Sequence, residues 1–169
     1  MSIYPISLEF IEDKAKLSWC DIKWAYEHNL ITASIPVRKA EKKVLAGNYS
    51  DAELNLSFLS PKQPENIMSC LNIICSEEGG GDWLKIKRKW LFITLSWLWN
   101  NRESFSEPLG EVESVYSDFD YPVEMESFIK YFPPSDGYDP SIHTYEENIE
   151  RLMRNWEFYL KKESAIFKC

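Results

Sequence analysis

Apolar residues recur along this chain at spacings of three and four, which is the period of helices that bury one face. In the first half the repeat runs through Trp19, Ile22 and Tyr26, and it returns as Ile67, Leu71 and Ile74. Strand-like alternation does not last for six residues anywhere. Helices are predicted to open at Ser18, Thr32, Ser50 and Pro64, the second of them ending near Gly47.

Three of the predicted helix starts carry a capping box, in which a hydroxyl side chain and an acid three residues later satisfy the first free N–H groups. The three boxes are Ser18 with Asp21, Ser50 with Glu53 and Thr144 with Glu147. The helix that begins at Pro64 is predicted to end at a glycine triplet, residues 79–81, which forms a flexible linker.

The most apolar segment is predicted to be a helix that is capped by Asp82 and runs from Trp83 to about Glu103. Beyond Lys89 its apolar residues cover nearly the whole circumference, which is typical of a central helix packed on several sides. A buried strand over residues 90–94 is the competing interpretation. The apolar stretch of about ten residues is too short to cross a bilayer.

The last third is also predicted to be helical, with a turn-rich loop at residues 133–140. Helices are expected from Pro108, from Asp120 or Pro122 to Phe132, and from Thr144. We therefore expect an all-α protein, a single-domain helical bundle of about seven or eight helices that spans residues 1–169.

Composition narrows the function classes. The 169 residues hold 19 basic and 27 acidic side chains, a formal charge of −8, which disfavours contact with nucleic acid or anionic lipid. The first 13 residues do not resemble a secretory signal. Four scattered cysteines do not suggest a disulfide scaffold, and Cys70 and Cys75 are interpreted as buried structural thiols. We expect a cytoplasmic protein with reduced thiols.

The negative charge is concentrated in residues 101–150, where thirteen acids and two bases give a net charge of −11. Two interpretations stay open. The acids can be solvated helix faces and first-turn residues, or they can form a surface that steers a basic partner. Aromatic residues of the kind that anchor protein interfaces lie among them. They are Phe119, Tyr121, Tyr131 and Tyr138.

No strong catalytic motif is present, and two histidines are too few for a zinc site built on histidine. We therefore expect a protein that is not an enzyme and uses no cofactor. The alternative is a carboxylate-dependent hydrolase in which Asp118, Asp120 and Glu124 bind a divalent cation. Asp136 and Asp139 lack the spacing of an EF-hand loop.

Four segments together resemble a bacterial family, domain-of-unknown-function family 2247, over about residues 8–160. These segments are residues 17–24, 116–122, 131–140 and 146–152. The resemblance implies no established catalytic activity. In size and acidity the family is similar to the immunity proteins of polymorphic or contact-dependent toxin systems.

The expectation is an immunity protein that binds and neutralises a cognate toxin, a basic nuclease domain, without contacting nucleic acid or membrane itself. A non-catalytic adaptor is a further alternative, and the sequence does not indicate the oligomeric state. The residues expected to bind the partner are Asp118, Asp120, Tyr121, Glu124, Asp136, Tyr138 and Asp139.

Overall fold

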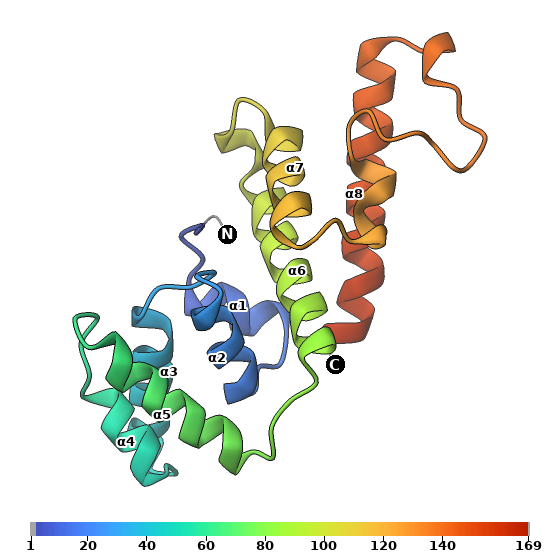
Figure 1. Cartoon of the computed structure of the whole chain (residues 1–169). Helices are drawn as coiled ribbons and strands as arrows, with labels where there is room; N and C mark the ends of the chain where they lie inside the picture. Colours follow the sequence, from blue (N-terminus) through green and yellow to red (C-terminus); the bar gives the residue numbers. More distant parts are fainter. Residues whose placement is uncertain (1–2, 169) are drawn as a thin grey trace. The chain divides into compact units, whose positions relative to one another are not determined.

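The computed structural model describes residues 3–168 and shows only helices within them. Figure 1 traces them along the chain. The prediction of an all-α protein with seven or eight helices is confirmed. The α-helices are α1 (Leu8–Lys14), α2 (Trp19–Glu27), α3 (Ser34–Leu45), α4 (Asp51–Ser57), α5 (Pro64–Glu77), α6 (Trp83–Asn100), α7 (Pro108–Asp118) and α8 (Tyr145–Phe167). Three short 3-10 helices are η1 (Arg102–Ser104), η2 (Val123–Phe128) and η3 (Pro140–Ile142).

The chain divides into two compact units, residues 1–90 and residues 91–169. We call them unit 1 and unit 2 and describe each by itself. Helix α6 passes through the boundary, so its first eight residues belong to unit 1 and the rest to unit 2. The expectation of a single domain stays a prediction.

Unit 1 packs α4 against both α3 and α5, α2 against α5, and α1 against α3. Its core is apolar apart from two buried acids, Asp21 and Glu53, which are 1% and 7% exposed. Asp21 completes the capping box of α2 by accepting from the Ser18 N–H at 2.8 Å. It also accepts from Lys89 Nζ at 2.7 Å, while the Trp90 indole donates to its backbone carbonyl at 2.9 Å. These bonds fix the start of α2 against α6.

A disulfide joins the first turn of α2 to the last turn of α5. It links Cys20 to Cys75 across a Cα–Cα distance of 4.7 Å. The prediction of reduced thiols is therefore wrong for this pair, and Cys75 is half-buried rather than buried. Cys70 is a free, half-buried thiol, and Cys169 lies outside the described residues. Because disulfides are typical of oxidising compartments, this one gives the expected cytoplasmic location no support.

Unit 2 is built on aromatic packing along α8. Trp156 is fully buried, with its ring centroid 5.0 Å from Trp99 of α6. Phe128 at the end of η2 lies 5.4 Å from Tyr159, and Phe92 stacks on Phe167 at 5.8 Å. The buried face of α8 therefore includes Trp156 and Tyr159.

The structure corrects one predicted helix and adds another. The predicted helix up to Phe132 is reduced to η2, because Asp120 and Tyr121 have positive φ before it and Ile129 is extended after it. Val123 is 73% exposed. The short helix α1 was not predicted, although Ser7 caps it by accepting from the Phe10 N–H. The strand alternative for residues 90–94 is wrong, since they lie inside α6.

None of the helices within residues 3–168 combines the length and apolar content needed to cross a bilayer.

Candidate protein-binding surface

The two units differ sharply in charge. Unit 1 contains twelve basic and twelve acidic residues and is neutral overall. Unit 2 contains seven basic and fifteen acidic residues, so the whole formal charge of −8 belongs to it. An uneven distribution of this kind creates a directional field that attracts cationic partners to one part of a molecule.

One group of predicted site residues is assembled on the first turns of α8 by Arg151. Its Nη2 donates to both carboxylate oxygens of Asp136, at 2.9 and 2.8 Å. Its guanidinium carbon lies 4.1 Å from the ring centroid of Tyr138. The hydrogen bond from Arg151 holds the pKa of Asp136 below its ordinary value, with a further contribution from the Tyr138 N–H. Asp136 therefore stays a carboxylate in a largely solvated position.

Further bonds hold the loop that precedes α8. The Tyr138 hydroxyl donates to Asn148 Oδ1 at 2.6 Å, and the Tyr138 ring stacks on His143 with centroids 4.5 Å apart. Asp139 caps η3 by accepting from the Ser141 hydroxyl and N–H, which lowers its pKa. This loop is thus fixed onto α8 by side-chain contacts rather than by backbone pairing.

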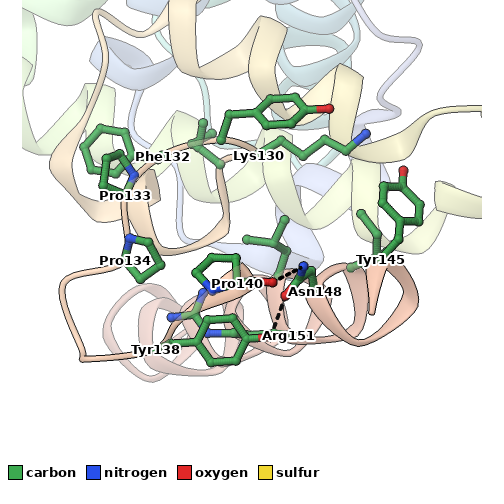
Figure 2. A pocket seen from close by; sticks show the side chains of 13 residues that line it. Lys130, Phe132, Pro133, Pro134, Tyr138, Pro140, Tyr145, Asn148 and Arg151 are labelled. Atoms are coloured by element: carbon green, nitrogen blue, oxygen red, sulfur yellow. Dashed lines mark hydrogen bonds between the residues drawn. The ribbon is translucent and has the colours of Figure 1, made fainter. Parts of the chain in front are cut away.

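A pocket of about 380 Å³ lies between this loop and α8 (Figure 2). We call it the proline pocket because three of the residues that line it are prolines. Its volume lies within the usual range for ligand pockets, about 300–1,000 Å³, and its lining is mainly apolar, as is usual for such pockets. Its lining is Ile129, Lys130, Tyr131, Phe132, Pro133, Pro134, Tyr138, Pro140, Tyr145, Asn148, Ile149, Arg151 and Leu152.

The polar groups at the proline pocket already have partners within unit 2. Lys130 Nζ lies 3.6 Å from a Glu107 oxygen and 5.6 Å from the Tyr145 ring centroid. The hydrogen bond with the Tyr145 side chain, followed by the Glu107 charge, raises the pKa of Lys130. Asn148 donates to the Pro140 carbonyl at 3.2 Å. The pocket therefore offers its ring and aliphatic surfaces rather than a free ionic group.

The other predicted residues lie at the end of α7, in the turn that follows it and at the start of η2. Asp118 is the last residue of α7, and Glu124 is an exposed residue in the first turn of η2. Asp120 and Tyr121 have φ values of 61° and 57°. Tyr121 is 63% exposed, and its ring meets Tyr116 edge-on at 5.2 Å. Left-handed backbone is costly for a tyrosine, so the surrounding structure imposes this exposed position.

The structure therefore brings the seven predicted residues into two groups. Asp136, Tyr138 and Asp139 form the loop on α8, while the other four occupy the turn after α7. Tyr131 was not among the seven predicted residues, yet its side chain is 91% exposed and its backbone has a φ of 64°.

Sequence reasoning missed two residues that shape the loop, Arg151 and Lys130. Arg151 lies one helical turn after Glu147, the second residue of the α8 capping box. Lys130 is the one base between residues 103 and 150, which could have singled it out.

The carboxylates required by the metal-dependent alternative do not converge. Across residues 3–168, no three histidine, cysteine, aspartate or glutamate side chains are placed to share a metal ion. The two acids on either side of Gly137 act locally instead, one pairing with Arg151 and the other capping η3.

Comparison with known proteins gives one family. Searches of curated proteins and of solved structures returned no match. A model of a family described as an uncharacterized protein conserved in bacteria (DUF2247) matches residues 8–164. That range covers both units, including the two groups of acidic and aromatic residues. The chain therefore belongs to the bacterial DUF2247 family.

Proposed function

We propose that this protein is an immunity protein that binds a cognate toxin through unit 2 and neutralises it without catalysis of its own. The single observation behind the proposal is the charge partition, which leaves unit 1 neutral and gives unit 2 the full −8. A basic nuclease is the partner that such a field suits, because nucleases must carry positive charge to bind nucleic acid. A nuclease partner would place the protein in the cytoplasm.

A tight complex also requires that the toxin dissociate slowly, and exposed aromatic rings in unit 2 can provide this. Tyr121, Tyr131 and Tyr145 are 63%, 91% and 61% exposed. Tyrosines of this kind are enriched among the few residues that dominate binding energy. Charge raises the association rate, and buried aromatic anchors lower the dissociation rate. The surface of unit 2 combines both features.

The proposal is tested by co-expression with candidate toxins encoded in neighbouring reading frames. Growth rescue together with co-purification of the two chains is the expected result. The absence of rescue and of a complex for every neighbouring candidate would contradict the immunity function. A stable partner that has no toxin activity would favour the adaptor alternative.

A further inference from the structure

A second hollow adjoins the proline pocket on the same face of unit 2. It has a volume of about 260 Å³ and shares Phe132, Pro133, Pro134, Arg151 and two other residues with the proline pocket. We call it the acidic hollow because Glu126 and Asp136 line it. The Asn155 amide, which donates to the Ser127 carbonyl at 2.8 Å, ties η2 to α8 beside it.

The two hollows have different chemistry. The proline pocket presents rings and aliphatic groups, and the polar atoms of Tyr138, Asn148 and Pro140 bond to one another there. The acidic hollow contains two carboxylates, and one of them, Asp136, balances Arg151. Glu126 lies in η2, where the neighbouring Glu124 adds to the negative field. One hollow therefore suits an uncharged side chain, and the other suits a cation.

One hollow suits an apolar group and its neighbour suits a cation. Such a pair fits an extended peptide segment better than one compact ligand. Neighbouring side chains of such a segment can enter the two hollows in turn. Charge complementarity also favours a basic segment, since unit 2 carries a net charge of −8.

The geometry points to a peptide-recognition site on unit 2 that takes a large apolar side chain in the proline pocket and an arginine or lysine in the acidic hollow. This inference deepens the proposed function, on which it rests for the identity of the partner. The occupant is a segment of the basic partner protein in which an aromatic residue and a basic residue lie close together.

The test uses the full chain labelled with ¹⁵N and short blocked peptides of alanine that contain one tryptophan and one arginine. One to three alanines separate the two side chains, so that the peptides sample the distance between the hollows. Saturable shifts of the Tyr138, Leu152 and Ser127 amides are expected with the best spacing. Replacing the peptide tryptophan by alanine, or its arginine by glutamate, should weaken binding at least tenfold.

Matched variants locate the site. Ile149→Trp fills the proline pocket and should abolish the shifts, whereas Ile142→Trp makes the same change at a residue outside both hollows that is 76% exposed. Glu126→Gln should weaken binding of the arginine peptide several-fold, while Glu113→Gln outside the hollows should not. If Ile149→Trp does not fold, the comparison of Glu126→Gln with Glu113→Gln still tests the site.

Three results would overturn the inference. These are the absence of saturable shifts in unit 2, equal binding of the arginine and glutamate peptides, and binding of free indole as tight as that of the peptide. The experiment requires no toxin, so its outcome is independent of the rescue assay. Peptide binding without rescue would reject the immunity function alone, and rescue without peptide binding would reject only this site.

Discussion

The guanidinium of Arg151 lies over the Tyr138 ring, with its central carbon 4.1 Å from the ring centroid, while the same group binds both oxygens of Asp136. One α8 side chain thereby positions two of the predicted binding residues. The side chain of Arg151 is 14% exposed and that of Asp136 is 61% exposed, so the carboxylate is the partner of this ion pair that faces solvent.

Removing Arg151 should raise the pKa of Asp136. The hydrogen bond from Arg151 is the largest cause of the lowered value, so Arg151→Gln should return it toward the ordinary range. Because the folded-state pKa is lowered, this pair stabilises the fold above the unfolded-state pKa and loses its effect as pH falls through the folded-state value. An NMR titration of the Asp136 carboxyl carbon measures the change. Arg154→Gln, at an exposed α8 position, is the control and should leave the titration unaltered.

The buried pair in unit 1 should be important for stability. Lys89→Met leaves the buried carboxylate of Asp21 without the ammonium group that lies 2.7 Å from it. Loss of one partner of a buried pair is costly, and we expect a decrease of about 3 kcal/mol in the free energy of unfolding. Urea denaturation followed by tryptophan fluorescence gives the value. Lys85→Met changes an exposed lysine of the same helix and should stay within about 0.5 kcal/mol of the parent. Equal stabilities of the two variants would show that the pair is not closed in solution.

The disulfide should protect unit 1 from unfolding. It closes a loop with a sequence separation of 55 residues, for which chain entropy gives about 4 kcal/mol. Paired Cys20→Ser and Cys75→Ser substitutions should therefore lower the denaturation midpoint strongly, whereas Cys70→Ser should have a small effect. Peptide mapping of protein purified without reductant should find Cys20 linked to Cys75. Alkylation of both cysteines in the folded, unreduced protein would contradict the pairing.

Three helix starts could be predicted from the sequence because each depends on residues within one turn. The hydroxyl–acid pairs at Ser18, Ser50 and Thr144 all form the predicted capping boxes. The apolar stripe of α5 is likewise buried at Ile67, Leu71 and Ile74. Local hydrogen bonding and a regular period therefore sufficed for most of the fold.

Features that depend on residues far apart in the sequence could not be predicted from local patterns. Cys20 and Cys75 meet only because α2 packs on α5, so their spacing in the sequence gives no indication of a bond. The helix predicted up to Phe132 failed because Asp120, Tyr121 and Tyr131 adopt positive φ, which no glycine in this stretch of the sequence signals. Likewise, the proline pocket exists only where the loop at residues 133–140 folds back on α8.

The exposed ring of Tyr131 should contribute to binding and not to stability. At 91% exposure it buries little area, so Tyr131→Ala should leave the free energy of unfolding within about 0.5 kcal/mol of the parent. If the ring is an anchor, the dissociation rate of the toxin complex should rise about tenfold or more. Surface plasmon resonance measures that rate. Tyr49→Ala truncates a tyrosine of unit 1 that is 44% exposed, and it should leave dissociation unchanged. Equal dissociation rates for both variants and the parent would exclude Tyr131 from the interface.

The charge of unit 2 is tested most directly by the association rate with the cognate toxin at low ionic strength. Asp120→Asn combined with Glu124→Gln removes two charges, and asparagine tolerates the positive φ at residue 120. The matched control, Glu41→Gln with Glu77→Gln, removes two exposed acids from unit 1. The account predicts that the first pair slows association about three- to tenfold, that the control does not, and that added salt removes the difference. Equal association rates for both pairs and the parent would contradict it.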